Sequence, residues 1–345
     1  MSPWSKMFAV SALVALGVPP SGAGAETVDE VARFYQSHPI TVTVGYTAGS
    51  GYDMVARTVA RHLPHHLPGN PSIVIVNEPG AGSLVAANRL YNLARADGTE
   101  LALFGRSIFM EPLMGNGQAK FDPTKYSWIG SAAGEMSLCV AWHGAKVKTW
   151  NDLLNTTFIA GANSPGSDTW VIANLINQLF GAKIKIVTGY PGGAEITRAI
   201  ESGEVDGRCG WSWSSLVATK ASWLTDKTIN VLVQFASESR PELKGVPLIT
   251  ELATTDNQRQ IARIILQRQE IAWPFAAPPG VPHERLQLIR DAFAATTRDP
   301  EFLKDAARLG IESTPKAGAD VDTMVREIYR MPPDVVALAK KILSP

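Results

Sequence analysis

The order of the apolar segments constrains this chain most. Short apolar runs of strand length alternate with amphipathic runs of helix length, and the alternation occurs in two successive series. Such alternation is typical of parallel α/β units, in which a helix connects each strand to the next. The strand-like runs are ITVTVGY (40–46), SIVIVNE (72–78), TELALFG (99–105), TFIAGA (157–162), KIKIVTG (183–189) and VDGRCGWSW (205–213).

The two series carry the same turn signals in the same order. In each, a loop of small residues ends in an aspartate that opens a helix, Asp53 or Asp168. A later strand ends in Pro-Gly, and Asp-Gly precedes the next strand. These dipeptides are common turn signals, so chance is the alternative, but three repeats in one order favour two α/β lobes built alike. We expect crossings near 130–141 and 230–236, which makes one hinged lobe of residues 26–135 and 236–345, and another of 136–235.

The composition describes a globular protein without a strong charge: of 345 residues 19% are charged, and the formal net charge is +0. Nucleic acid is not expected as a partner, because phosphate binding requires a basic surface.

Residues 1–25 contain Lys6, then an apolar run and a small-residue Ala-Gly-Ala end. They are predicted to be a secretory signal peptide cleaved near Ala25. In an oxidising compartment Cys139 and Cys209 either pair or remain separate buried thiols, and the sequence leaves both open.

Several kinds of chemistry are disfavoured. Gly49-x-Gly51 follows a strand and precedes a helix, as a dinucleotide-binding fingerprint requires, but Met54 stands where the third glycine belongs. The chain has no Gly-x-Ser-x-Gly elbow. Three histidines lie in HLPHHLP (62–68), where the prolines disrupt the helical spacing that a zinc site needs. We therefore predict no cofactor, no metal ion and no catalytic residue, and an exported enzyme is the less favoured alternative.

The two small-residue loops instead favour a clamp for a carboxylate. A helix N-terminus offers unpaired N–H groups and partial positive charge, and small residues let a ligand approach them. Two such loops facing each other across a hinge can hold one small acid. Asp53 and Asp168 are interpreted chiefly as N-caps of their helices. The predicted ligand-binding residues are Tyr46, Thr47, Ala48, Gly49, Ser50, Gly51 and Asp53 in the first loop, and Asn163, Ser164, Gly166, Ser167, Asp168 and Thr169 in the second.

Further candidates lie at other strand ends. Arg106, followed by Ser107, comes directly after a strand and can pair with a ligand carboxylate, or else form a surface or interlobe ion pair. Trp211 and Trp213 alternate along a predicted strand and form either an apolar wall for the ligand or part of the second core. Tyr190 precedes a Pro-Gly turn, and its phenol is expected to reach the cleft.

At these residues the chain resembles the Bug-type periplasmic solute receptors, the substrate-binding proteins of tripartite tricarboxylate transporters. AGSGYDMVAR (48–57) is similar to the family's glycine loop and helix, with Ser50 in place of one glycine. VNEPGAGS (76–83) and AAPPGVPHERLQLIRDAF (276–293) are similar to two further family segments. The chain departs from the family at Thr188–Tyr190, at Arg106 and in the tryptophan-rich strand, so the resemblance implies a longer or aromatic acid rather than a succinate-like ligand.

The resemblance implies a two-lobe type II periplasmic-binding-protein fold, with the ligand in the cleft between hinged lobes. It also implies a periplasmic, monomeric receptor without catalysis. Its ligand is then a small carboxylate, such as an aromatic acid or a di- or tricarboxylate, which it delivers to the membrane permease of the transporter. The alternative is a ligand-sensing input protein that docks on a sensor kinase.

Overall fold

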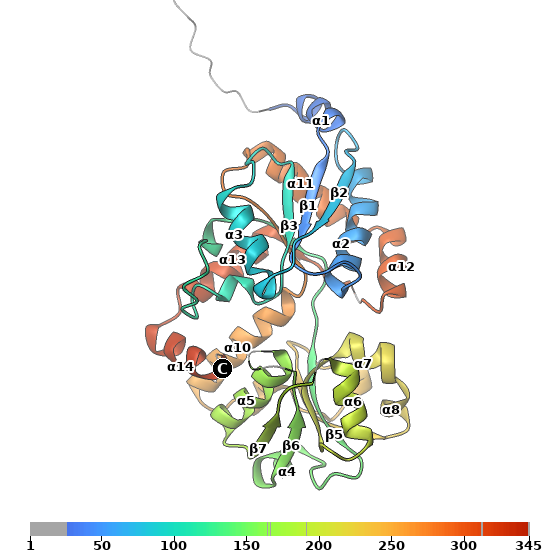
Figure 1. The fold of residues 1–345 in the computed structure, drawn as a ribbon, viewed down its shortest axis with the longest axis vertical. Coiled ribbons are helices and arrows are strands. Elements are labelled where there is room, and N and C mark those ends of the chain that lie inside the picture. Colours follow the sequence, from blue (N-terminus) through green and yellow to red (C-terminus); the bar gives the residue numbers. More distant parts are fainter. Residues whose placement is uncertain (1–25, 164, 166, 191, 312, 344–345) are drawn as a thin grey trace, which may run out of the picture.

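The computed structural model describes residues 26–163, 165, 167–190, 192–311 and 313–343, which form two α/β lobes stacked along the long axis of the molecule (Figure 1). The predicted signal peptide, 1–25, lies outside the described residues, as do Ser164 and Gly166 of the second predicted loop.

The first lobe is built on a six-stranded sheet in the order β11-β4-β10-β3-β1-β2. Strands β1, β2 and β3 are parallel, whereas β10 runs antiparallel to both β3 and β4. The strands are β1 (Ile40–Val44), β2 (Ile73–Asn77), β3 (Glu100–Leu103), β4 (Ser127–Ser131), β10 (Pro274–Ala277) and β11 (Lys316–Ala317).

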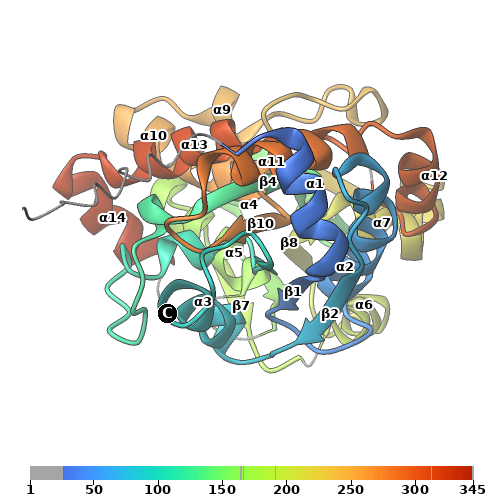
Figure 2. The same ribbon diagram turned by 90° about the horizontal axis from the view of Figure 1, so that it is seen from above.

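Helices cover both faces of this sheet, and Figure 2 shows them arranged around it. Apolar residues of α2 and α11 pack with Val42 and Val44 on one face. Those of α3 and α13 pack with Ala102 and Trp128 on the other. The helices of this lobe are α1 (Val28–Ser37), α2 (Gly51–His62), α3 (Leu84–Asn92), α11 (His283–Thr296), α12 (Pro300–Arg308) and α13 (Gly318–Tyr329).

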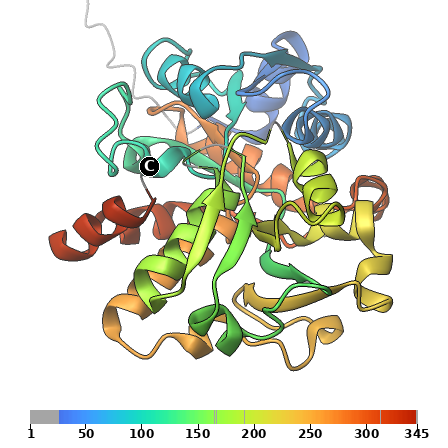
Figure 3. The same ribbon diagram turned by 60° about the horizontal axis from the view of Figure 1, so that its bottom comes forward.

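The second lobe has a five-stranded sheet in the order β7-β6-β8-β5-β9. Helices α5 and α6 lie on opposite sides of it (Figure 3), because the chain crosses from β6 to β7 and then back to β8. The strands are β5 (Ser137–Trp142), β6 (Phe158–Gly161), β7 (Ile184–Val187), β8 (Gly207–Ser212) and β9 (Ile229–Phe235); the helices are α4 (Trp150–Asn155), α5 (Asp168–Phe180), α6 (Gly193–Glu201), α7 (Trp213–Lys220) and α8 (Ser222–Thr225). Cys139 and Cys209 are paired neighbours on β5 and β8 and form a disulfide, which answers the question that the sequence left open.

Three helices after β9 pack against the second lobe. α9 (Ile249–Leu252) and α10 (Asp256–Glu270) follow β9, and Gln258 donates a 2.8 Å hydrogen bond to the carbonyl of Leu179. The last helix, α14 (Pro333–Leu343), lies against α5, where Asn174 donates to the carbonyl of Ile342 over 2.8 Å. The described chain therefore passes between the two lobes three times: between β4 and β5, at the end of α10, and between α13 and α14.

These passages differ from the sequence-based expectation in two places. The return to the first sheet comes after α10, later than expected, because β9 stays paired with β5 as far as Phe235. The C-terminal helix was expected to cover the first lobe, but its apolar residues belong to a cluster that includes α5 and α10. The assignment of residues 26–135 with 236–345 to one lobe and 136–235 to the other stays a prediction.

Candidate functional site

The loop between β1 and α2 is held by its own aspartate. Ser50 is the N-cap of α2, and its side chain accepts a hydrogen bond from the Asp53 backbone N–H. The prediction that Asp53 is the N-cap is therefore wrong, because the serine three residues earlier takes that place. The Asp53 carboxylate instead accepts from the backbone N–H of Gly49 and from the side chains of Arg57 and Asn77, each over 2.9 Å.

This arrangement leaves the tip of the loop open to a ligand. Gly49 adopts a φ of 78°, and Thr47, Ala48 and Gly49 are exposed. Asp53 is 2% exposed, and the hydrogen bond from Arg57 lowers the pKa of its carboxyl to about 2 against the opposing effect of burial. The carboxylate of Asp53 thus shapes the loop from behind, while the small residues face outwards.

An aromatic stack adjoins the loop. The ring of Tyr46 stacks on that of Tyr52 with a centroid separation of 4.2 Å, and Tyr52 contacts Trp273 at 4.6 Å. The Tyr52 hydroxyl accepts a hydrogen bond from the backbone N–H of Arg106 over 3.2 Å. Burial raises the pKa of both tyrosines, so each phenol stays protonated at neutral pH. Together these rings form an apolar face with polar tips beside the first predicted loop.

The second predicted loop has the same kind of capping. Ser167 is the N-cap of α5 and accepts from the backbone N–H of Trp170. Asp168 is the first residue of the helix, so the prediction that it is the N-cap is also wrong. Asn163 and Thr169 close the loop, because the Asn163 backbone N–H donates to the Thr169 hydroxyl over 3.0 Å. The Asn163 amide also donates to the carbonyl of Tyr190 over 3.0 Å.

The freed Asp168 carboxylate joins the two lobes. It forms one ion pair with Arg106, which follows β3 in the first lobe. It forms a second with Arg268 of α10, whose Nη2 lies 2.8 Å from Asp168 Oδ1. Arg268 Nη2 also donates to the Ser107 hydroxyl over 2.7 Å, and Arg106 Nη1 donates to Gln269 Oε1 over 2.9 Å. Of the two roles considered for Arg106, the structure shows the interlobe ion pair.

The electrostatics of this cluster are set mainly by burial and by its three charges, with smaller effects of Glu135 on Arg106 and of Glu111 on Arg268. Burial works to raise the pKa of the Asp168 carboxyl, but the two guanidiniums outweigh it and hold the pKa below its ordinary value. Burial lowers the pKa of Arg268, which is only 6% exposed. Counted within the cluster, two guanidiniums against one carboxylate leave a formal excess of one positive charge, which Glu135 near Arg106 and Glu111 near Arg268 partly offset. Such an excess in a partly buried place attracts an anion.

The remaining predicted residues lie elsewhere in the second lobe. Trp211 is 1% exposed and packs at right angles to Trp223, so it belongs to the core. Trp213 is the first residue of α7 rather than part of a strand, so the two tryptophans do not alternate along β8 as predicted. The Tyr190 phenol donates to Glu204 of its own lobe over 2.6 Å, and this contact, rather than one across the cleft, occupies the hydroxyl.

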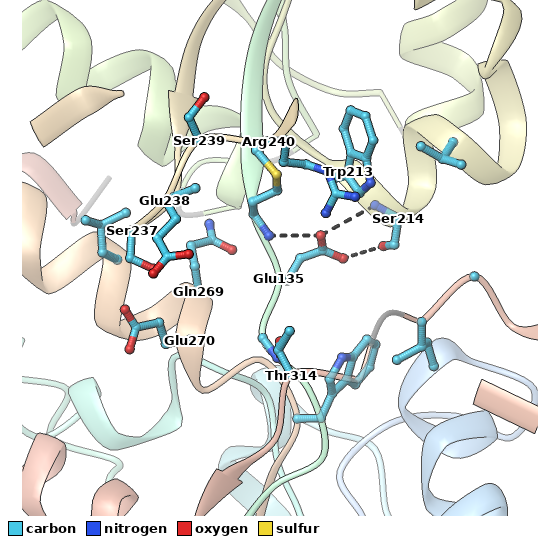
Figure 4. A pocket seen from close by; sticks show the side chains of 18 of the residues that line it. Glu135, Trp213, Ser214, Ser237, Glu238, Ser239, Arg240, Gln269, Glu270 and Thr314 are labelled. Carbon is cyan, nitrogen blue, oxygen red and sulfur yellow. Dashed lines mark hydrogen bonds between the residues drawn. The ribbon is translucent and has the colours of Figure 1, made fainter. Parts of the chain in front are cut away.

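Residues 132–136, the hinge segment, connect β4 to β5. A cavity of about 600 Å³ lies beside this segment, between the two lobes. Figure 4 shows Glu135 of this segment with its carboxylate turned toward Ser214 of α7. The same carboxylate accepts from the backbone N–H of Met136 over 2.9 Å. Trp213 lines the cavity, and so do Gln269 and Trp273, which also contact the Arg106 side chain and the aromatic stack, respectively. These two residues form a shared wall between the cavity and the predicted clamp.

The sequence-based prediction missed Arg268, Gln269 and Trp273. All three come from IARIILQRQEIAWPF (261–275), where α10 passes from one lobe to the other. The signal was partial: Arg268 and Gln269 closely follow the apolar run Ile264–Leu266 and precede a strand, and charged residues are rarely buried unless paired. Within the described part of the chain, no group of His, Cys, Asp and Glu is placed to hold a metal ion, and His62 and His66 contact Asp305 and Asp299 of the α12 region.

No protein-family model matches the chain. Two curated relatives are UPF0065 proteins, the Bug family. The one from Cupriavidus necator is 24% identical over 88% of this chain and 88% of its own length. The one from Bordetella bronchiseptica is 26% identical over 91% and 87%. Among the described helices, none has the length and apolar character needed to span a membrane.

Three solved structures share the fold. A TctC solute-binding protein from Polaromonas has a TM-score of 0.71 at 20% identity, covering 90% of this chain and 99% of its own. The periplasmic binding protein BugD scores 0.62 at 17%, covering 89% and 98%. MatC from Rhodopseudomonas palustris, with bound malate, scores 0.58 at 19%, covering 89% and 99%. The predicted two-lobe α/β fold and the resemblance to Bug-type receptors are therefore confirmed.

Proposed function

We propose that the protein is an exported solute-binding receptor. In this proposal it captures a small organic acid between its lobes and delivers it to the permease of a tripartite tricarboxylate-type transporter. The observation that carries the proposal is the charge at the lobe boundary, where Arg106 and Arg268 share the single carboxylate of Asp168. A carboxylate ligand entering this region neutralises the excess positive charge through charge-assisted hydrogen bonds, the strongest kind that such a site offers.

The flanking loops complete the proposed site. Thr47–Gly49 lie exposed next to the N-terminus of α2, and the half-buried Ser167 lies beside that of α5. These groups and the two arginines come from both lobes, so an acid that contacts them all favours the closed arrangement. Differential affinity for the closed state is what drives closure in a hinged receptor.

The body of the acid is proposed to lie against aromatic side chains. Tyr46, Tyr52 and Trp273 form a continuous apolar face beside the first loop, and Trp273 also borders the hinge cavity. A cavity of about 600 Å³ is within the range of small-molecule sites. This supports an acid with an apolar or aromatic portion over one that is carboxylate at every end.

The relatives support binding without turnover. The shared fold belongs to solute-binding proteins, one of them with bound malate. Capture outside the cytoplasm fits the predicted signal peptide, and transfer to a permease fits the transporter to which such receptors belong.

A thermal-shift screen across organic acids tests the proposal, followed by calorimetry on each acid that binds. We expect at least one monocarboxylic or dicarboxylic acid, from a panel that includes malate and aromatic acids, to raise the melting temperature. The matched primary amides are the controls, because they keep the shape and lack the charge. The proposal fails if no acid shifts the melting temperature, or if amides bind as well as acids.

A further inference from the structure

Arg208 is a cation buried inside the second lobe. It is the second residue of β8 and is 5% exposed, with its guanidinium stacked over the ring of Trp211 at 4.0 Å from the centroid. Nη1 donates to the carbonyl of Gly193 over 3.1 Å, and Nε, which is also buried, has no hydrogen-bond partner. A buried guanidinium with so few acceptors is costly unless something else supplies them.

The neighbouring acidic side chains are already engaged elsewhere. Glu195 pairs with Arg198 over 3.0 Å, Glu204 accepts from the Tyr190 phenol, and Asp206 accepts from the backbone N–H of Ile159. Across the described ranges, no carboxylate forms an ion pair with Arg208. Burial lowers the pKa of Arg208 to about 9, which still leaves the guanidinium charged at neutral pH. The lobe thus holds a positive charge without a counter-charge of its own.

The guanidinium lies at the N-terminus of α6. Gly192 is the N-cap, and the described residues supply no side-chain cap for this nine-residue helix. A Cβ added to Gly193 would lie 3.2 Å from Arg208 Nη1 and 3.5 Å from Nη2, so the guanidinium stands directly beside the first turn. Both the open N–H groups and the helix dipole are positive there. A guanidinium whose Nε has no hydrogen-bond partner, next to a helix end without a side-chain cap, is what an anion beside them would stabilise.

We propose that Arg208 and the first turn of α6 form an anion-binding site in the second lobe, separate from the Arg106–Asp168–Arg268 cluster. Its ligand is an oxyanion, either a carboxylate of the captured organic acid or a free inorganic oxyanion. The guanidinium contributes charge and Nη donors, and the first turn of the helix contributes backbone N–H groups. The site does not depend on the proposed receptor function, because an inorganic oxyanion meets the same groups.

Sulfate binding, measured by calorimetry at low ionic strength, tests the site. All proteins carry Arg106→Gln, which removes one guanidinium of the interlobe cluster. We expect that adding Arg208→Gln weakens sulfate binding about tenfold to a hundredfold, the effect of losing a charge-assisted hydrogen bond. Adding Gly193→Ala fills the space beside the guanidinium and is expected to weaken it at least about fivefold, while alanine favours the helix and so preserves folding. Lys185→Gln, exposed on β7 of the same lobe, is the control and leaves binding unchanged.

Malate, in otherwise wild-type protein, distinguishes the two sources of the anion. If Arg208→Gln weakens both sulfate and malate, the site takes a carboxylate of the captured acid. If it weakens sulfate and leaves malate unchanged, the site takes a free inorganic oxyanion. The inference is overturned if the Arg106→Gln protein does not bind sulfate, or if Gly193→Ala and Arg208→Gln, both folded by circular dichroism, bind it as before. A failure of every organic acid to bind would count against the receptor proposal alone.

Discussion

Arg268 and Asp168 meet at the lobe boundary, with Arg268 Nη2 2.8 Å from Asp168 Oδ1. Arg268 belongs to α10, and Asp168 opens α5 of the second lobe. Burial of the pair opposes both charges. The pKa of the Asp168 carboxyl nevertheless lies below its ordinary value, because a second guanidinium, that of Arg106, also faces it. The cluster therefore joins the lobes and at the same time keeps a positive excess for a ligand.

Replacing Arg268 by glutamine should weaken acid binding about tenfold or more, because one of the two guanidiniums is lost while Arg106 still neutralises Asp168. Calorimetry with the acid found by the thermal-shift screen measures this. Arg263→Gln is the matched control: it lies on the same helix, is 62% exposed and pairs only with Glu327 among the described residues. Equal losses in both variants would show that the charge of α10, not the position of Arg268, matters.

Replacing Asp168 by asparagine should have the opposite effect on binding. The amide removes the carboxylate that competes with the ligand for both arginines, so the formal excess of positive charge rises from one to two. We expect about threefold to tenfold tighter binding of the same acid, with a steeper dependence on salt. Titrations at low and high ionic strength measure both. Weaker binding would mean that Asp168 contacts the ligand itself or is required to position the arginines.

Acid should remove the stability that Asp53 contributes. Its folded pKa is about 2, against an ordinary value of about 4, so its contribution is complete above pH ~4–5 and is lost as the pH falls towards 2. Asp53→Asn should lower the free energy of unfolding by about 1–3 kcal/mol at pH 7. Urea unfolding should show this difference shrinking between pH 5 and about pH 3. The exposed Asp320, replaced by asparagine, should show no comparable pH-dependent loss.

Reduction of the Cys139–Cys209 disulfide should destabilise the second lobe. The bond closes a loop with a sequence separation of 70, and losing such a crosslink costs about 2–5 kcal/mol. Thermal unfolding with and without a phosphine reductant measures the change. A Cys139→Ala, Cys209→Ala double variant should have the melting temperature of the reduced wild-type protein. Its melting temperature should not change when the reductant is added. A wild-type protein indifferent to reductant would contradict the prediction.

The fold was more predictable than the site, and particular residues explain the difference. The alternation of strands and helices depends on local periodicity, and the small-residue loops opened α2 and α5 where the sequence predicted. The capping aspartates were misassigned because Ser50 and Ser167 are equally good caps and stand earlier in each loop. Arg268 and Trp273 could not be placed from the sequence, because their contacts join segments 100 or more residues apart.

Trp213 shows a similar limit. Trp211 and Trp213 read as alternate residues of one strand, but β8 ends at Ser212 and a helix begins. Whether residue 213 continues the strand or begins a helix depends on a long-range contact, in which the Trp213 backbone N–H donates to the carbonyl of Met136 in the hinge segment. No local sequence pattern indicates this contact.

The passage from α13 to α14 makes the C-terminal helix a tether. α13 packs on β4 of the first lobe and α14 on α5 of the second, and residues 330–332 alone connect them. Each residue spans at most about 3.6 Å, so this connection can lengthen only to the order of 10 Å before one helix must detach. The opening of the molecule is thereby limited mechanically on the side that carries α14, whatever the hinge itself allows.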